Sequence, residues 1–191
     1  MIRVSHLSKS FGDNLLFRDW SFEIAEGEHV SITAPSGMGK TTLLRILCGL
    51  ERADEGTVEG ISPGDVAYLF QEPRLFPQLT ALENVTCIHP SPEAAESDAR
   101  QLLSALGLAD AADKYPHELS GGMKQRVALA RTLLADRPVV FLDEPFTACD
   151  PELKESVRAL VDQACRGKTL VLISHDPEDR KTLTHRDLTL V

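Results

Sequence analysis

Short apolar runs recur along the chain, and between them lie stretches whose apolar residues have helical spacing. Runs such as VVFL and LVLI are continuous, which is typical of strands covered on both faces of a sheet. The expected strands are residues 28–34, 65–70, 138–143, 169–174 and 187–191. The expected helices are residues 40–50, 121–135 and 151–165. Because strands and helices alternate, the pattern predicts an α/β fold with a mostly parallel sheet.

Two regions depart from this alternation. Residues 1–26 contain IRVSHL, a turn at Gly12-Asp13-Asn14, and then WSFEIAE, in which apolar and polar residues alternate. This pattern predicts an N-terminal antiparallel β unit. Residues 73–118 contain no convincing strand, because they are proline-rich at first and then helical, most clearly at 94–106. They predict a helical insert.

The length of 191 residues fits one domain with a sizeable insert, since domains typically have about 100–200 residues. We expect a single domain over 1–191, with an α/β core at 1–72 and 119–191 and a helical subdomain at 73–118. Hydrophobic residues make up 42% and charged residues 26% of the chain, which excludes a disordered or fibrous protein.

The net charge of −9 makes the chain a poor general binder of nucleic acid or anionic lipid, although it can still hold a phosphate locally. We therefore expect no nucleic-acid partner. The longest unbroken apolar run is VAYLF, and a membrane-spanning helix needs about 20 residues, so we expect no direct insertion into a membrane.

The cysteines are Cys48, Cys87, Cys149 and Cys165, and no two of them are spaced as CxxC. No histidine cluster lies beside them, and the N-terminus has no apolar signal core. These features indicate ordinary thiols of a cytoplasmic protein rather than a disulfide or zinc framework.

The expected strand 28–34 leads directly into the segment APSGMGKTT and then into a helix, which is the context of a phosphate-binding loop. Glycines at 37 and 39 let backbone N–H groups turn toward a phosphate, and the helix N-terminus adds its dipole. Lys40 would reach the β- and γ-phosphates, and the Thr41 hydroxyl would ligate Mg²⁺. Ala34 stands where the pattern GxxxxGK[ST] begins with glycine, and a glycine turn with a chance GKT is the alternative. The expected nucleotide-binding residues are Ala34, Pro35, Ser36, Gly37, Met38, Gly39, Lys40, Thr41 and Thr42.

The expected strand 138–143 ends in two carboxylates, Asp143 and Glu144. In proteins with a phosphate-binding loop, an aspartate at the end of such a strand holds Mg²⁺. Glu144 lies on the other side of the chain, where it can act as the general base for hydrolysis. A solvated helix-capping pair is the alternative, and the upstream loop favours the chemical interpretation.

The segment LSGGMKQR places a serine and two glycines before a helix with Met123, Val127, Ala130 and Leu134 on one face. This arrangement predicts a second anion-binding helix start, although a capped helix with a glycine turn would look the same. With the phosphate loop and the strand ending in DEP, it resembles the signature motif of ATP-binding cassette (ABC) ATPases. The resemblance covers essentially the whole chain.

The resemblance implies a P-loop NTPase fold with a RecA-like core, and it assigns four further residues. Gln71 would contact Mg²⁺ and the attacking water, and His175 in LVLISHD would contact the γ-phosphate. Asp150 in TACD resembles the D-loop aspartate, and Phe11 stands where the family places an aromatic ring under adenine. Taken alone, Phe11 also fits a core residue.

In this family, ATP and Mg²⁺ lie between two ATPase domains, and the loop of one domain faces the signature motif of the other. The resemblance therefore implies a homodimer or a pair of ABC ATPases, with Ser120, Gly121, Gly122 and Met123 acting across the dimer. These residues would contribute to the partner's nucleotide site.

The segments FQEPRLFPQLTALENV and LSGGMKQRVALARTLL resemble nitrate, sulfonate and taurine importer ATPases. This finer resemblance implies an integral membrane permease subunit as partner and a place on the cytoplasmic face of the membrane. The apolar residues after Gln71 would help to grip the permease, or they form the core of the helical insert; they are Leu75, Phe76, Pro77 and Leu79.

We therefore expect an ATP hydrolase that dimerises around Mg-ATP and energises solute import through a separate permease. One alternative is a soluble ABC ATPase that couples dimerisation to a partner outside transport. Another is a module that binds ATP but hydrolyses it poorly, which Glu144 and His175 argue against.

Overall fold

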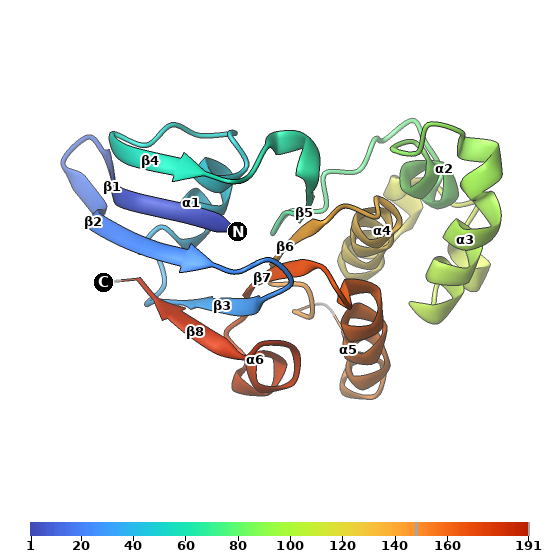
Figure 1. Ribbon diagram of the computed structural model, residues 1–191. Helices are drawn as coiled ribbons and strands as arrows, with labels where there is room; N and C mark the ends of the chain where they lie inside the picture. The colour runs from blue at the N-terminus through green and yellow to red at the C-terminus, as the bar shows by residue number, and fades with distance from the viewer. Residues whose placement is uncertain (148, 191) are drawn as a thin grey trace. The chain divides into compact units, whose positions relative to one another are not determined.

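The computed structural model describes residues 1–147 and 149–190, which form two compact units. The first unit comprises Met1–Val66, Arg137–Phe141 and the described chain from Gly167 onward. The second comprises Ala67–Asp136 and the described part of Leu142–Arg166. Figure 1 labels the helices and strands of both units.

The first unit contains the antiparallel sheet expected at the N-terminus. Strands β1 (Ile2–Phe11), β2 (Asn14–Ile24) and β4 (Glu55–Glu59) follow the order β2-β1-β4, and β1 is antiparallel to both neighbours. The hydrophobic pattern misses β4, because its sequence EGTVE has a single large apolar residue and four of its five residues are exposed. A Cβ at Gly56 would lie 2.5 Å from the Ser5 carbonyl oxygen, so β4 can approach β1 this closely only with glycine there.

A second, five-stranded sheet has the order β5-β6-β7-β3-β8. Its strands are β3 (His29–Thr33), β5 (Val66–Leu69), β6 (Val139–Asp143), β7 (Thr169–Ile173) and β8 (Arg186–Thr189). Strand β3 pairs in parallel with β7 and β8, and every residue of β6 and β7 is buried. The continuous apolar runs thus mark strands covered on both faces, and the predicted α/β fold with a parallel sheet is confirmed. Val191, the end of the expected strand 187–191, lies outside the described residues.

Helix α1 (Lys40–Leu47) follows β3 and buries Leu43, Leu44 and Leu47. The expectation that this helix continues to residue 50 is wrong, because Gly49 adopts the left-handed conformation with φ 72° and ends it. Leu50 lies beyond that turn with 59% of its surface exposed, so it does not help to dock the helix. The first unit also contains the short helix α6 (Pro177–Leu183), which the apolar pattern does not reveal.

The second unit is helical apart from the strand segments at its borders. Its helices are α2 (Ala81–Thr86), α3 (Pro92–Ala105), α4 (Gly121–Leu134) and α5 (Pro151–Cys165). Helix α2 packs against both α3 and α4. Short 3-10 helices occur at Ala109–Ala111 and Pro116–Glu118 in this unit, and at Pro63–Asp65 in the first unit. Residues 73–118 are all described and contain no strand, as expected, while the exact domain boundaries stay a prediction.

Among the described residues, no helix combines the length and the apolar character that crossing a membrane requires. The cysteines form no disulfide in this part of the chain.

Candidate nucleotide-binding site

The expected phosphate loop connects β3 to α1 in the first unit. Gly37 and Gly39 have φ values of 84° and 85°, a left-handed conformation that favours glycine. A Cβ at Gly39 would lie 3.0 Å from two carbon atoms of Leu16, so packing from β2 also requires glycine there. A hydrogen bond of 3.3 Å from the Met38 N–H to the Pro35 carbonyl closes the loop. The sequence pattern does not reveal that Leu16 supports this loop.

Lys40 closes the loop from the other side. Its Nζ donates hydrogen bonds to the carbonyl oxygens of Ala34 at 2.8 Å and Pro35 at 3.3 Å. An ammonium group has three N–H donors. The two hydrogen bonds hold the side chain over the loop, and a third N–H can still donate to a ligand. Ala34 is not among the residues with positive φ, which explains why alanine is compatible with the opening position of the loop.

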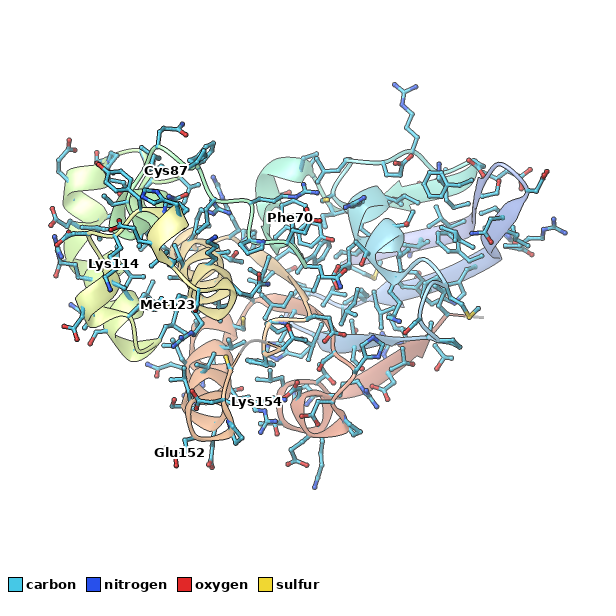
Figure 2. All side chains as sticks on the ribbon, turned by 180° about the vertical axis from the view of Figure 1, so that it is seen from behind. Phe70, Cys87, Lys114, Met123, Glu152 and Lys154 are labelled. Carbon is cyan, nitrogen blue, oxygen red and sulfur yellow. The ribbon has the colours of Figure 1, made fainter. Side chains whose placement is uncertain are left out.

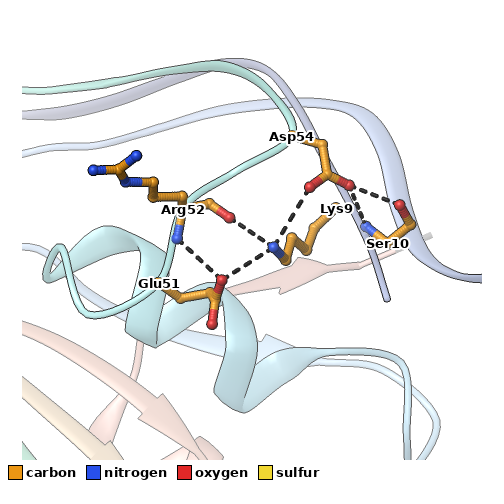
Figure 3. Close-up of polar contacts among 5 residues, drawn as sticks. All are labelled: Lys9, Ser10, Glu51, Arg52 and Asp54. Atoms are coloured by element: carbon orange, nitrogen blue, oxygen red, sulfur yellow. Dashed lines mark hydrogen bonds and ion pairs between the residues drawn. The ribbon is translucent and has the colours of Figure 1, made fainter. Parts of the chain in front are cut away.

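Phe11 ends β1 with 50% of its surface exposed, so it is not a residue of the core. The Lys9 Nζ lies 4.6 Å from the centre of its ring. Figure 3 shows how Lys9 is held: its Nζ donates to Glu51 Oε1 at 3.0 Å and to the Arg52 carbonyl at 2.8 Å, and it lies 3.4 Å from Asp54 Oδ1. The hydrogen bond to Glu51 raises the pKa of Lys9, so the cation beside the ring is stabilised in its charged form. Sequence reasoning did not identify this cluster.

His175 follows β7 in the first unit and is exposed. The residue before it, Ser174, is fixed by three hydrogen bonds. Its hydroxyl donates to Asp179 Oδ2 at 2.7 Å and accepts from the Asp176 N–H at 3.1 Å, while Arg180 donates to its carbonyl at 2.9 Å. This network holds the backbone from which the His175 side chain projects.

The two carboxylates at the end of β6 belong to the second unit, and both are buried: Asp143, the last residue of the strand, is 1% exposed and Glu144 8% exposed. Glu144 has a φ of 54°, which is an unfavourable conformation for a residue with a Cβ. The Thr147 hydroxyl donates to the Glu144 carbonyl at 3.1 Å and helps to hold this turn. Backbone strain of this kind occurs preferentially at functional sites, and no sequence pattern could have revealed it.

The signature residues form the start of α4 in the second unit. Ser120 caps the helix, since its Oγ accepts a hydrogen bond of 3.2 Å from the Met123 N–H. Gly121 and Gly122 lie in the first turn, where backbone N–H groups have no partner within the helix. A Cβ at Gly121 would meet no atom within 4 Å, so packing within the described chain does not require glycine there.

Asp150 caps α5 through a hydrogen bond of 2.9 Å from the Leu153 N–H to its Oδ1. Ala148, in the same TACD segment, lies outside the described residues. Gln71 is exposed and follows Phe70, which is labelled in Figure 2 and lies directly after the end of β5 at Leu69. Both Asp150 and Gln71 belong to the second unit.

The structure therefore distributes the expected site over two units. The first unit contains Phe11, the loop 34–42 and His175, and the second contains Gln71, the signature residues, Asp143, Glu144 and Asp150. The expected Mg²⁺ ligands all offer oxygen atoms, from Thr41, Gln71 and Asp143. Such a donor set suits Mg²⁺, which is typically held by one or two carboxylates together with substrate phosphates. Among the described residues, there is no cluster of three or more His, Cys, Asp or Glu side chains that could hold a metal ion.

Comparison with known proteins gives consistent matches. The family described as "ABC transporter" matches residues 17–147. The aliphatic sulfonates import ATP-binding protein SsuB 1 of Pseudomonas savastanoi pv. phaseolicola is 41% identical, over 99% of this chain and 79% of its own length. The glutamine transport ATP-binding protein GlnQ of Escherichia coli is 40% identical, over 92% of this chain and 81% of its own length.

Solved structures agree with these sequence relatives. The dimeric structure of MJ0796, a bacterial ABC transporter cassette, has a TM-score of 0.90 and 30% sequence identity. A dimeric post-hydrolysis state of MJ0796 bound to ADP and Pi has a TM-score of 0.89. Both matches cover 100% of this chain and 94% of the solved chain.

Proposed function

Because the chain belongs to the ABC transporter family of ATP-binding proteins, we propose that it hydrolyses ATP to energise solute import through a separate membrane permease. The chain is an ABC-type ATPase with the P-loop NTPase fold. The proposed binding of nucleotide rests above all on the loop between β3 and α1. Left-handed Gly37 and Gly39 shape this loop, and the Lys40 ammonium lies across it.

The roles proposed for Lys40, Thr41, Asp143 and Glu144 follow from the chemistry of the side chains, and those proposed for Gln71 and His175 follow from the family resemblance. Lys40 would bind the charge of the β- and γ-phosphates, and Thr41, Gln71 and Asp143 would hold Mg²⁺, which supplies charge neutralisation when bound. Glu144 would accept the proton of the attacking water. His175 would contact the γ-phosphate, from a backbone that the Ser174 network fixes.

We further propose that two copies of the chain pair around the nucleotide, with the signature residues of one copy on the phosphate of the other. The dimeric form of the MJ0796 structures supports this proposal. The space beside Gly121 supports it as well, because it leaves room for a group from outside the chain. The first-turn N–H groups of α4 suit an anion at that position.

The permease partner is proposed from the relatives, whose names describe import of sulfonates and transport of glutamine. These names favour import over a partner outside transport, and they imply a place on the cytoplasmic face of the membrane. The local structure supports a docking role for Phe76, which is 47% exposed and so does not belong to the core of the insert. Buried Asn84 holds its loop, accepting from the Phe76 N–H at 2.7 Å and donating to the Phe76 and Leu79 carbonyls at 3.0 Å.

The test combines binding and transport. We expect Lys40→Ala to abolish ATP binding measured by calorimetry, because the acidic chain offers no substitute cation in the loop. In proteoliposomes containing the permease encoded beside its gene, the wild-type chain should drive ATP-dependent uptake of a labelled solute and Lys40→Ala should not. Unchanged ATP affinity in Lys40→Ala would contradict the proposed loop chemistry. If the chain hydrolyses ATP but no neighbouring permease takes up solute, the proposed import is contradicted and the proposed ATPase activity is not.

A further inference from the structure

Helix α4 is connected to the segment around Gln71 by two of its side chains. Gln125 Nε2 donates a hydrogen bond of 3.2 Å to the carbonyl of Phe70, the residue before Gln71. Arg131 Nη2 donates to the carbonyls of Pro73 at 3.0 Å and Arg74 at 3.1 Å. The backbone is therefore held to α4 on both sides of Gln71, and all of these residues belong to the second unit.

Arg131 is a charged group in an unusual position. Its side chain is half-buried, and among the described residues it makes no ion pair. Burial lowers the pKa of Arg131 below its ordinary value, which reflects the cost of removing a cation from water. The two carbonyl oxygens compensate for part of this cost, so the guanidinium and the turn at residues 73–74 fix each other.

The same turn contains strained backbone. Arg74 has a φ of 47°, a left-handed conformation that side chains with a Cβ rarely adopt. Its guanidinium carbon lies 4.1 Å from the centre of the Phe70 ring, which stacks in turn on Tyr68 at 4.1 Å. Such a conformation persists only where the surroundings determine it, and here the Arg131 hydrogen bonds hold the carbonyl of the strained residue and that of the residue before it.

We propose that Gln125 and Arg131 are positioning residues that hold Gln71 in place for hydrolysis by fixing residues 70–74 against α4. The inference rests on the proposed function, in which Gln71 contacts Mg²⁺ and the attacking water. Positioning of Gln71 by α4 also concerns the signature residues, because α4 begins with them. One helix thus carries both the motif offered to the partner's nucleotide and the hydrogen bonds that place this chain's own Gln71.

The test compares conservative variants in two backgrounds. Arg131→Lys keeps the charge but loses the planar guanidinium that reaches both carbonyls, and Gln125→Met keeps the shape but loses the donor. With Gln71 present, each variant should lower kcat roughly tenfold to a hundredfold and leave the KM for ATP nearly unchanged. In a Gln71→Ala background, the same variants should change kcat less than about twofold, because the residue they position is absent.

Arg126→Lys is the matched control. Arg126 also lies on α4 and donates to a backbone carbonyl at 2.8 Å, but that carbonyl belongs to Leu106. Any effect of this control on kcat should therefore be the same factor in both backgrounds. Hydrogen exchange provides a second readout: in Arg131→Lys the backbone N–H groups of residues 71–76, other than Pro73, should exchange faster, while those of α4 should not change.

The inference is overturned if Arg131→Lys and Gln125→Met lower kcat by the same factor with and without Gln71, or if exchange at 71–76 is unaltered in Arg131→Lys. Should Arg131→Lys fail to fold, Gln125→Met carries the comparison. If Gln71→Ala hydrolyses ATP at the wild-type rate, the role of Gln71 and this inference are both refuted. The proposed ATPase is judged separately, by Lys40→Ala.

Discussion

Glu144 combines two properties at the scale of a single residue: a buried carboxylate and a left-handed backbone with φ 54°. Replacing it with glutamine keeps the size and hydrogen-bonding capacity of the side chain but removes the proposed base. We expect Glu144→Gln to lower ATP hydrolysis about 10²–10⁴-fold. Nucleotide binding should survive, because Lys40, Thr41 and Asp143 remain.

The variant should also accumulate as an ATP-bound dimer, because removing the carboxylate reduces charge repulsion beside the γ-phosphate. Size exclusion with ATP and Mg²⁺ would detect this dimer, and ADP should not support it. Hydrolysis at the wild-type rate would exclude Glu144 as the base. Loss of hydrolysis without an ATP-dependent dimer would mean that the chain needs its permease in order to pair.

Phe11 is the second residue whose role can be isolated. Its exposed ring suits stacking on adenine, and stacking is worth about 1–3 kcal/mol per base in nucleic-acid sites. We expect Phe11→Ala to weaken ATP and ADP binding by an amount at the lower end of this range, as measured by calorimetry. If both affinities are unchanged while circular dichroism reports an intact fold, the ring does not stack on the nucleotide.

At the scale of elements, the Lys9 cluster joins β1 to the connection between α1 and β4, and it makes a prediction about pH. Asp54 accepts from the Ser10 N–H at 2.6 Å and from the Ser10 hydroxyl at 2.7 Å, and these bonds lower the pKa of its carboxyl. Because the pKa of Asp54 is lower in the folded state than the unfolded-state pKa of about 3.9, the ionised carboxylate stabilises the fold when the pH is above that unfolded-state pKa. This stabilisation is lost as the pH falls through the pKa of the folded state. Asp54→Asn should therefore reduce the free energy of unfolding at pH 7, and the difference from wild type should shrink below about pH 4.

Urea unfolding at several pH values measures this difference. Asp13→Asn is the control, because Asp13 is exposed in the turn between β1 and β2 and its side chain makes no hydrogen bond to any described residue. A difference between Asp54→Asn and wild type that stays constant from pH 7 to pH 3 would argue against the lowered pKa.

The elements also show what the sequence can and cannot predict. Strands β6 and β7 were predictable because every residue is buried, and α5 begins and ends where its apolar spacing indicates. Strand β4 was missed because its pairing with β1 depends on backbone hydrogen bonds and on Gly56 rather than on apolar side chains. Within the candidate site, the motifs identified residue types, but the left-handed turns at Arg74 and Glu144 depend on tertiary contacts and leave no local pattern.

At the scale of the whole molecule, the proposed dimer separates nucleotide binding from hydrolysis. The phosphate loop belongs to the first unit and Ser120 to the second, where it caps α4. We expect Ser120→Arg to leave ATP binding by the monomer nearly intact, since loss of such a cap typically costs about 1 kcal/mol of stability. Hydrolysis should be lost, because a bulky cation would block closure on the partner's γ-phosphate.

Calorimetry at low protein concentration and a phosphate-release assay measure the two effects separately. Much weaker ATP binding by the isolated monomer would contradict a site composed of two copies. A fully active Ser120→Arg would exclude the signature serine from the reaction.

The backbone at Glu144 has a practical consequence for protein engineering. Glycine or asparagine would adopt its left-handed conformation with less strain than glutamate does. A library screened for heat resistance alone should therefore enrich these residues at position 144 and discard the proposed base in the process. Any effort to make this ATPase more durable has to screen for turnover at the same time, because at this position thermal tolerance and catalysis favour different amino acids.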